Sequence, residues 1–291
     1  MTVKKQHIKQ QSDLSEKTKR MITGTTIEWS KSKEEIWAEL EQRIEAKQPA
    51  GRTVVMGTRA WLAVAATIAL LTAIAVFMQV YTKTVGVPSG KHSTVILPDG
   101  SQVRLNAQSA IIFKPLMWNF SRNVRFEGEA YFEVKPGKKF EVVSAYGKTS
   151  VLGTSFNIYA RKKDYQVTCV TGKVMVMQTQ NNKTTILYPG QQAVIKKDGS
   201  LDVFSGVNTE QTTAWLNNIL TFTSMPLPKV FEEISRQYGV VIRFPGDLDY
   251  IYTGTFKKTT PVENALNLVC KPFMLKLNRT SEDEYAISRN Q

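Results

Sequence analysis

Cysteine and histidine are nearly absent from this chain of 291 residues. The two cysteines are Cys169 and Cys270, and the two histidines are His7 and His92. Structural zinc sites take four Cys or His ligands at short spacings, which these four residues do not have. The composition therefore predicts no metal site. Both cysteines occur in apolar contexts and are interpreted as small core residues, with a disulfide between them in an oxidising compartment as the alternative.

Signatures of catalysis are also missing. No glycine-rich phosphate loop occurs, and the segment Gly153-Thr-Ser-Phe-Asn157 lacks the second glycine of a nucleophile elbow. Glu127, Glu129 and Glu133 are spaced to share one face of a strand, but the phenylalanines around them have the pattern of core residues. The sequence therefore predicts a protein that is not an enzyme, with no catalytic residues and no cofactor.

Acidic residues are too few to balance the basic ones, since 25 Asp and Glu face 38 Lys and Arg. Residues 1–59 carry a net charge of +4 and the remainder +9. A basic chain can bind nucleic acid, but no dense Lys/Arg cluster with interleaved aromatic residues occurs here. We therefore expect a solvated basic surface and no direct contact with nucleic acid.

Long apolar runs are absent except for one. Residues 60–82 contain no charge, and Trp61 and Tyr81 lie near the two ends of this run. A helix of that length reaches about 35 Å, which exceeds the roughly 30 Å of the hydrocarbon core of a bilayer. Aromatic rings near both ends suit the headgroup regions. A buried core helix is the alternative, but such helices seldom run so long without a charge. The sequence predicts one transmembrane helix.

The basic residues around this run predict its orientation. The twenty residues before it contain four Lys and Arg, and the twenty after Tyr81 contain two. The excess favours a cytoplasmic N-terminus. A cleaved signal peptide is disfavoured, because some 59 polar residues precede the apolar run. We expect a single-pass inner-membrane protein with its larger C-terminal part in the periplasm.

The segment before the span contains one convincing helix. Residues 1–27 are polar and are expected to form a disordered cytoplasmic tail, whereas residues 28–59 are expected to contain an amphipathic helix. Ser32 and Glu35 have the spacing of a capping box. The helix has one narrow apolar stripe, formed by Ile36, Trp37, Leu40 and Ile44. It is interpreted either as a helix on the lipid surface or as a docking helix for a cytoplasmic partner.

After the span, the pattern changes to short alternating apolar runs separated by turn dipeptides. Residues 83–92 are expected to form a linker, and residues 93–207 an all-β domain, either a sandwich or a short solenoid. Pro98-Asp99-Gly100-Ser101 lies between two alternating runs and predicts a hairpin.

Residues 215–291 have a third pattern, in which strand, helix and strand follow one another twice before a final strand. It predicts a small α+β domain of two βαβ units, with Pro228 in the first turn of one helix and Gly239 at its end. The outer strands of such a domain can accept a strand from a partner. The candidates are residues 240–244 and 252–257.

These motifs together resemble the FecR family of transmembrane anti-sigma regulators, in the form common among Bacteroidetes. The resemblance covers about residues 60–291. It depends on motifs in the family's order: Leu97-Pro-Asp-Gly-Ser-Gln-Val-Arg-Leu-Asn106, Arg122-Asn-Val-Arg-Phe-Glu-Gly-Glu-Ala-Tyr-Phe-Glu-Val134, Val151-Leu-Gly-Thr-Ser-Phe-Asn157, Pro189-Gly-Gln191, Trp215, Tyr238-Gly-Val-Val-Ile242 and Thr253-Gly-Thr-Phe256.

The resemblance implies an anti-sigma factor that holds an extracytoplasmic-function sigma factor at the inner membrane. It also implies a periplasmic contact with the N-terminal signalling domain of a TonB-dependent outer-membrane transporter, whose fold the C-terminal domain resembles. The +9 charge of this side would favour an acidic partner. The segment before the span is shorter than the family's usual helical domain. A membrane-anchored periplasmic interaction protein without a sigma-factor partner is therefore the alternative.

Two sets of site residues follow from this interpretation. The sigma factor is expected to bind Ile36, Trp37, Leu40 and Ile44. The transporter signalling domain is expected to bind the strands that contain Val240, Ile242, Phe244, Tyr252 and Thr255.

Overall fold

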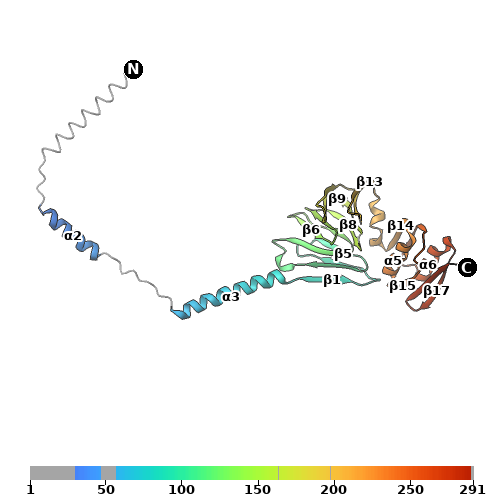
Figure 1. Ribbon diagram of the computed structural model, residues 1–291, viewed down its shortest axis with the longest axis horizontal. Helices are drawn as coiled ribbons and strands as arrows, with labels where there is room; N and C mark the ends of the chain where they lie inside the picture. Colours follow the sequence, from blue (N-terminus) through green and yellow to red (C-terminus); the bar gives the residue numbers. More distant parts are fainter. Residues whose placement is uncertain (1–29, 47–56, 163, 197, 290–291) are drawn as a thin grey trace, which may run out of the picture. The chain divides into compact units, whose positions relative to one another are not determined.

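The computed structural model describes residues 30–46, 57–162, 164–196 and 198–289 (Figure 1). The chain divides into two compact units, residues 1–66 and 67–291, and each is described by itself. The expected disordered tail, residues 1–27, lies outside the described residues.

The first unit contains helix α2 (Lys33–Ala46), which begins with the predicted capping box. The backbone N–H of Ser32 donates to Glu35 Oε2 at 3.0 Å, and the N–H of Glu35 donates to Ser32 Oγ at 3.2 Å. These two bonds satisfy N–H groups that have no partner within the helix. None of the residues of α2 is buried, so its apolar stripe is accessible in this unit.

Helix α3 (Thr58–Val80) contains most of the predicted span and begins two residues earlier than expected. It is the one described helix that is long and apolar enough to cross a membrane, and none of its residues is buried. Its apolar side chains are therefore largely exposed, unlike those of a core helix. Only Tyr81 and Thr82 separate α3 from the first strand.

Thirteen described strands follow in one connected sheet, which we call the β domain (Figure 1). The strands are β1 (Lys83–Val87), β2 (Ser93–Ile96), β3 (Gln102–Leu105), β4 (Ser109–Phe113), β5 (Arg122–Glu133), β6 (Phe140–Val143), β7 (Gly147–Val151), β8 (Ser155–Arg161), β9 (Asp164–Thr171), β10 (Val174–Gln178), β11 (Thr184–Leu187), β12 (Gln191–Ile195) and β13 (Leu201–Ser205). A short 3-10 helix, η1 (Pro115–Met117), lies between β4 and β5.

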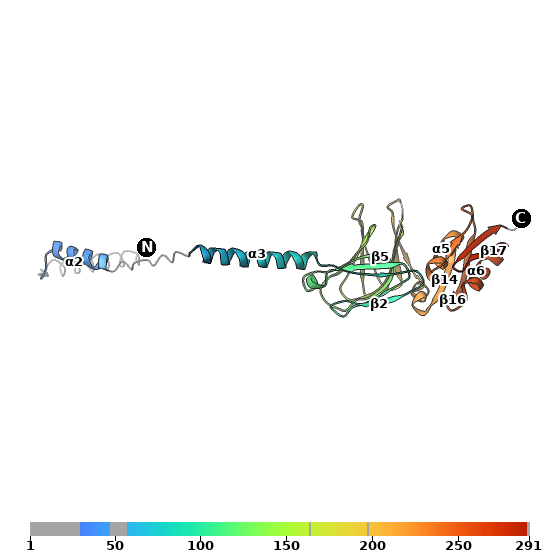
Figure 2. The ribbon, with the colours of Figure 1, turned by 90° about the horizontal axis from the view of Figure 1, so that it is seen from below.

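Strand β5 belongs to both layers of this sheet. Its first half pairs with β4 and β6, and its second half pairs with β3 and β8. The chain changes direction at Gly128, which has a φ of 113°, and a Cβ there would lie 2.6 Å from Ser109 Cα. Only glycine tolerates this conformation and this close approach. The bend folds the sheet into two layers (Figure 2).

The two layers share one hydrophobic core. The alternating apolar residues noted in the sequence are buried in it, and Phe132 and Phe156 stack with their ring centroids 5.1 Å apart. The predicted hairpin is confirmed, since β2 pairs with β3 across the turn at Pro98. The prediction of an all-β domain is confirmed, and of the two arrangements left open the structure has the layered one.

The prediction that residues 83–92 form a linker is wrong for the first half of this segment. Lys83–Val87 forms β1 and pairs with β4 along its whole length, and Val87 is buried. Five residues that include Gly86 are a weak strand signal by themselves. The partner is β4, more than twenty residues away, and such long-range pairing is not visible in local sequence.

A smaller domain follows the short helices α4 (Thr209–Thr212) and η2 (Ala214–Asn217). Its elements, in chain order, are β14 (Ile219–Pro226), α5 (Leu227–Tyr238), β15 (Val241–Arg243), β16 (Ile251–Lys257), α6 (Val262–Cys270), η3 (Lys271–Phe273), β17 (Leu275–Ser281) and β18 (Glu284–Arg289). The predicted signals of α5 are confirmed, with Pro228 in the first turn and Gly239 as a left-handed cap.

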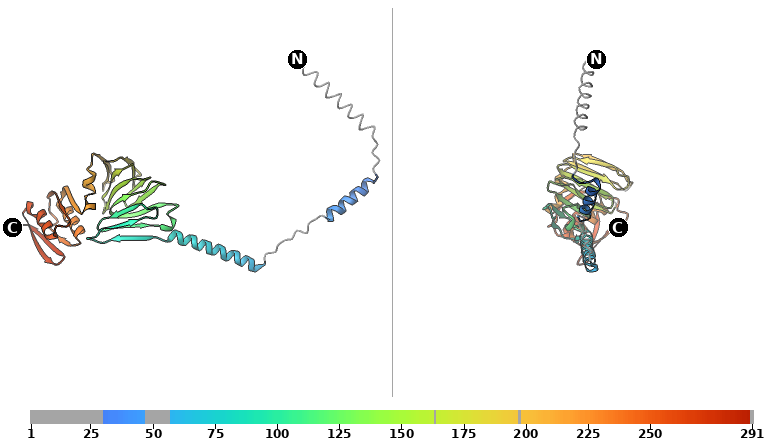
Figure 3. Two further views of the ribbon diagram at one scale, coloured as in Figure 1. Left: turned by 180° about the vertical axis from the view of Figure 1, so that it is seen from behind. Right: turned by 90° about the vertical axis from the view of Figure 1, so that its left-hand side faces the viewer.

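The strands of this C-terminal domain form two sheets, seen from behind in Figure 3. β14 pairs with β16 in one sheet, and β15, β18 and β17 lie in that order in the other. Each helix contacts strands of both sheets. The predicted order of strand, helix and strand, repeated before a final strand, is confirmed. The two strands that flank each helix lie in different sheets, however, so neither unit has its strands paired with each other. The order of elements alone did not determine which strands pair.

The two cysteines belong to different hydrophobic cores. Cys169 is buried in the β domain and Cys270 in the C-terminal domain, and both are free thiols. The interpretation as small core residues is confirmed, and the alternative of a disulfide between them is wrong.

Candidate partner-binding sites and the domain junction

The four residues of the apolar stripe on α2 are accessible. Trp37 is 59% exposed and Ile44 57%, Leu40 is exposed, and Ile36 is partly buried. Positions 36, 40 and 44 follow at intervals of four and therefore lie on one face of the helix. An exposed aromatic side chain flanked by aliphatic ones suits a helix that enters a hydrophobic groove.

The five predicted residues of the C-terminal domain divide by burial. Val240, Ile242 and Tyr252 are buried in the core, Phe244 is partly buried against it, and Thr255 is exposed. Four of the five side chains therefore pack inside the domain. A partner that approached here would meet the backbone of these strands and not these core side chains.

Both strands have a free edge in the described part of the chain. β15 pairs only with β18, and β16 pairs only with β14. On β15, the N–H of Val241 donates to Asp283 O, so the N–H of Ile242 points to the open side. On β16, the N–H of Lys258 donates to Asn218 O, and by the alternation of antiparallel bonds the N–H of Thr255 points outward.

Two exposed apolar side chains, next to the buried residues of β15 and β16, were not among the site residues predicted from the sequence. Val241 is 54% exposed on β15 and Ile251 56% exposed on β16. They alternate with buried residues, so the period-two pattern could have placed them on the outer face. They are the apolar groups that a visiting strand would meet.

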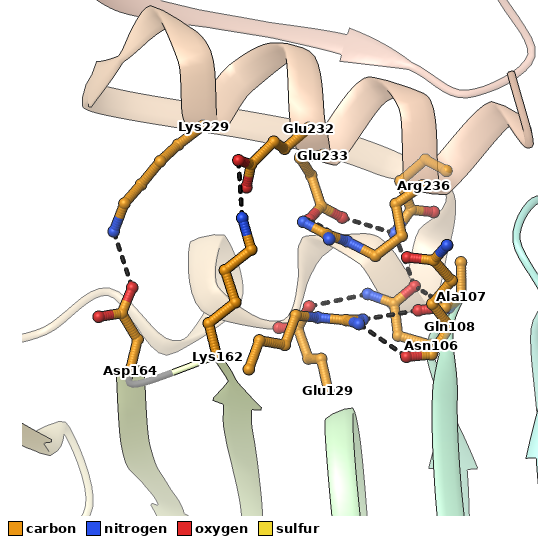
Figure 4. Close-up of polar contacts among 12 residues, drawn as sticks. Asn106, Ala107, Gln108, Glu129, Lys162, Asp164, Lys229, Glu232, Glu233 and Arg236 are labelled. Atoms are coloured by element: carbon orange, nitrogen blue, oxygen red, sulfur yellow. Dashed lines mark hydrogen bonds and ion pairs between the residues drawn. The ribbon is translucent and has the colours of Figure 1, made fainter. Parts of the chain in front are cut away.

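A third candidate site lies where the C-terminal domain meets the β domain, and we call it the domain junction (Figure 4). It consists of Asn106, Glu129, Asn157 and Arg161 from the β domain and Glu233, Arg236 and Gln237 from α5. The Gln237 amide group donates to Asn106 Oδ1 at 2.7 Å and to Glu233 Oε1 at 2.8 Å. One glutamine side chain thereby joins the two domains.

Glu129 is the central acid of the domain junction. Its carboxylate accepts hydrogen bonds from Asn106 Nδ2 at 2.8 Å and Asn157 Nδ2 at 3.1 Å. Burial, and then the negative charge of Glu233, raise the pKa of Glu129 to about 7, against the opposing effect of Arg161. This carboxyl group can therefore change its charge near neutral pH.

Two arginines belong to the domain junction. The Arg161 guanidinium donates to Gln108 O at 2.7 Å and Ala107 O at 2.6 Å, and burial lowers the pKa of Arg161. Arg236 donates to Glu233 Oε2 at 3.0 and 2.8 Å. Both guanidinium groups are thus hydrogen-bonded, but Arg161 Nε is buried without a partner among the described residues.

His92 and Trp215 extend the domain junction. His92 Nε2 lies 3.0 Å from Gln237 Oε1, and its ring packs edge-on against Trp215 with centroids 5.6 Å apart. Trp215 Nε1 donates to Asn157 Oδ1 at 3.3 Å. Burial lowers the pKa of His92, which favours its neutral form. The sequence suggested no role for this histidine, because its partners lie far away in the chain.

The rim of the domain junction is held by exposed ion pairs. Lys162 contacts Glu232 and Lys229 contacts Asp164, both at 2.8 Å (Figure 4). A cleft of about 400 Å³ lies beside them, lined by charges of both signs from both domains. Exposed ion pairs contribute about 1 kcal/mol or less each. The rim can therefore be opened at a small cost in free energy.

The comparisons with known proteins identify both domains. One family model, FecR protein, matches residues 83–175, and a second, FecR, C-terminal, matches residues 219–283. Together they cover more than half of the chain. The chain belongs to the FecR family. The first match begins at β1 and the second at β14, so the FecR matches start with the first strand of each domain.

Solved structures have the same fold as this FecR chain. Crystal structures of a candidate anti-sigma factor from Parabacteroides distasonis ATCC 8503, at 2.50 and 1.65 Å resolution, match it with TM-scores of 0.66 and 0.65. Each is 26% identical and covers 72% of this chain, and the match includes 100% of the crystallised chain. No protein of curated function matches.

These findings support a regulatory, signal-transducing role, because the FecR anti-sigma family is regulatory. Among the described residues, no group of three or more His, Cys, Asp or Glu side chains could hold a metal ion. The domain junction holds titratable groups but no nucleophile paired with a base. Its geometry suits a contact between domains that can be altered.

Proposed function

We propose that this FecR chain is a non-enzymatic, inner-membrane anti-sigma factor with a cytoplasmic N-terminus. The proposal depends on one observation: the apolar, unburied helix α3 lies in the sequence between the helix α2, with its accessible stripe, and the two FecR domains. We assign residues 28–59 to the cytoplasm, residues 60–82 to the membrane, and the β domain and C-terminal domain to the periplasm. The candidate anti-sigma factor from Parabacteroides distasonis supports this role.

The proposed cytoplasmic partner is an extracytoplasmic-function sigma factor. The stripe of α2 places Trp37 and Leu40 on an exposed face, and both would be buried in a groove of the partner. Aromatic anchors of this kind typically cost about 2 kcal/mol or more when truncated. The stripe also explains why α2, which is too short to be stable alone in water, would gain from a partner.

The proposed periplasmic partner is the N-terminal signalling domain of a TonB-dependent transporter. The open edges of β15 and β16 supply the outward N–H groups of Ile242 and Thr255 for strand addition, with Val241 and Ile251 beside them. Residues 215–291 contain nine Lys and Arg against eight Asp and Glu, so nearly all of the positive charge lies in the β domain. Charge attraction to an acidic partner would therefore act through the β domain.

The proposed signal path runs through the domain junction. A partner bound to the C-terminal domain would shift α5, which carries Glu233, Arg236 and Gln237 against the β domain. The displaced β domain is joined to α3 by only two residues. Movement of α5 would thereby reach the membrane helix without a flexible linker.

Co-purification tests the cytoplasmic half of this proposal. The full chain with Trp37→Ala and Leu40→Ala should lose the sigma factor encoded in its own genome, and the sigma-dependent genes should be derepressed at unchanged protein level. Gln42→Ala with Glu45→Ala, on the opposite face of α2, is the matched control and should retain the sigma factor. If the wild-type chain retains none, a membrane-anchored interaction protein without a sigma factor is the correct interpretation.

Binding to transporter signalling domains tests the periplasmic half. Thr255→Pro removes one outward N–H from β16 without touching the ladder to β14, and should weaken binding about fivefold or more, since a hydrogen bond contributes about 1 kcal/mol. Thr255→Ala keeps the N–H and is the matched control. Equal binding of both variants would show that β16 is not the docking edge, and β15 is then tested with Ile242→Pro.

A further inference from the structure

We propose that the end of the β domain next to α3 rests on the bilayer surface through three loops, residues 114–121, 134–139 and 152–154. We call these loops the membrane-facing platform. The inference rests on the proposed function in one respect, namely that α3 spans a membrane. The occupant of the platform is the lipid surface into which α3 itself is inserted.

Strand register places the first loop beside the exit of α3. Only Tyr81 and Thr82 separate Val80 from Lys83, so the chain from the end of α3 to the start of β1 reaches at most about 11 Å. Lys83 pairs with Phe113, the last residue of β4. The loop at 114–121 therefore begins next to the end of the span. Figure 2 shows the turn after β4, in green, at the end of the β domain from which β1 starts.

The other two loops lie at the same end of the β domain. Arg122, which follows the first loop, pairs with Phe140, which follows the second. Phe140 in turn pairs with Val151, which precedes the third. By contrast, residues 88–92 at the other end of β1 contact the C-terminal domain, since Gly90 N donates to Arg236 O at 2.9 Å. The platform and the C-terminal domain are thus at opposite ends.

Hydrogen bonds join the three loops into one ordered surface. Lys138 Nζ donates to Asn119 O at 3.3 Å, and Gly137 N donates to Leu152 O at 2.9 Å. The Arg122 guanidinium donates to the carbonyl oxygens of Lys138 at 2.6 Å and Lys135 at 3.0 Å.

An aromatic anchor holds the first loop in place. Trp118 is buried, with its ring centroid 5.8 Å from that of Phe113 and 6.0 Å from that of Phe140. The Phe120 N–H donates to Met117 O at 3.0 Å. The backbone that carries the exposed side chain of Phe120 is therefore an ordered turn.

The surface of the platform is apolar and basic. Phe120 is 77% exposed and Leu152 64%, and Leu116 is also exposed. These side chains are accompanied by exposed lysines at positions 114, 135 and 138, whereas Asp99 is paired with Arg122 and Glu141 with Lys139 and Lys148. The unpaired charge is positive. Apolar tips surrounded by lysines suit the headgroup region of an anionic bilayer.

Spin labels on the full chain in lipid nanodiscs test the proposal. A label at Phe120→Cys should collide more with oxygen, which partitions into lipid, than with a water-soluble nickel chelate. Met274→Cys is the matched control, because Met274 is also 77% exposed but lies in the C-terminal domain. Leu70→Cys, in the middle of α3, reports on the span. The native cysteines are buried, and the chain without an added cysteine provides the background.

Four outcomes are distinguishable. Labels at 70 and 120 in lipid, with 274 in water, are the expected result. If the label at 70 is in lipid and the label at 120 is in water, the platform is refuted and the membrane anchoring by α3 stands. A label at 120 that is shielded from both reagents has the same consequence, and would indicate contact with a second protein copy. A label at 70 outside lipid overturns the anchoring, and the platform with it.

Charge provides an independent measurement. Each lysine near an anionic surface strengthens binding to that surface about fivefold. A triple variant should therefore weaken binding of the platform to the bilayer by roughly two orders of magnitude; it combines Lys114→Gln, Lys135→Gln and Lys138→Gln. The label at 120 should then leave the lipid of phosphatidylglycerol nanodiscs. Replacement of Lys183, Lys196 and Lys257, away from the platform, should leave it there. An equal effect of both triple variants would refute the role of the platform lysines.

Discussion

The partly buried carboxyl group of Glu129 allows a stability prediction whose sign and size can be calculated. Burial and the neighbouring Glu233 raise its pKa to about 7 in the folded protein, from a reference value of 4.5. The folded state therefore binds this proton more tightly than the unfolded state. The contribution to stability is fully present only while Glu129 is protonated, and it is lost as the pH rises from about 5 through 7.

The size of this contribution to the free energy of unfolding follows from the difference between the folded and unfolded pKa values of Glu129, which corresponds to about 3 kcal/mol. Replacement by Gln removes the charge and keeps the size of the side chain. The new amide in Glu129→Gln would retain the bond from Asn106, whose Oδ1 is fixed by Gln237 and the N–H of Ala107, and would turn its nitrogen to Asn157. Asn157 can flip its amide group so that its oxygen accepts a hydrogen bond from the new amide at position 129. It then loses the hydrogen bond from Trp215, at a cost of about 1 kcal/mol.

The expected result is a difference in stability that depends on pH. The free energy of unfolding of Glu129→Gln minus that of the wild type should increase by about 2 to 3 kcal/mol between pH 5 and pH 8. Urea unfolding of the full chain in detergent, followed by the fluorescence of Trp215 at the domain junction, would measure it. Glu127→Gln, an exposed neighbour on the same strand, controls for the loss of one carboxylate. A difference that stays constant, or that falls with pH, would refute the argument.

Two further predictions concern the bend in β5 and the topology of the chain. Gly128→Ala should destabilise the β domain by about 3 kcal/mol or more, because position 128 combines a φ of 113° with a close contact to Ser109. Gly190→Ala is the control and should cost about 1 kcal/mol, because position 190 has a φ of 79° but open space around it. Thermal unfolding compares them, and equal losses would contradict the steric reason. An alkaline phosphatase fusion after Val207 should be active and one after Lys47 inactive, and the reverse pattern would overturn the proposed orientation.

Local features of the fold could be predicted from the sequence. The capping box at Ser32, the hairpin turn after Leu97 and the helix end at Gly239 depend on residues within a few positions of one another. The uncharged apolar run at residues 60–82, which predicted a membrane helix, is likewise a local signal. In each instance the backbone preference and the polar pattern indicate the same structure, and the structure follows them.

Features that depend on distant partners could not be predicted. Glu129 was predicted only to share a strand face with Glu127 and Glu133, yet its partner Asn106 lies 23 positions before it and Gln237 of the same cluster 108 positions after it. The bend at Gly128 carries the second half of β5 into the other layer, and this moves Glu129 to the domain junction. The pairing of β14 with β16 was missed for the same reason, because strand–helix–strand order leaves the choice of sheet open.

The path of β5 has a mechanical consequence. Its two halves run between the end of the β domain near α3 and the end at the domain junction, so a pull on the C-terminal domain acts along the strands. The ladder bonds lie across that direction and must all stretch together before the strands can slide. The domain junction opposes the same pull with a few side-chain bonds and two exposed ion pairs. A pull that exceeds the strength of the domain junction therefore opens it before the β domain loses its shape, whereas a weaker pull is passed through both.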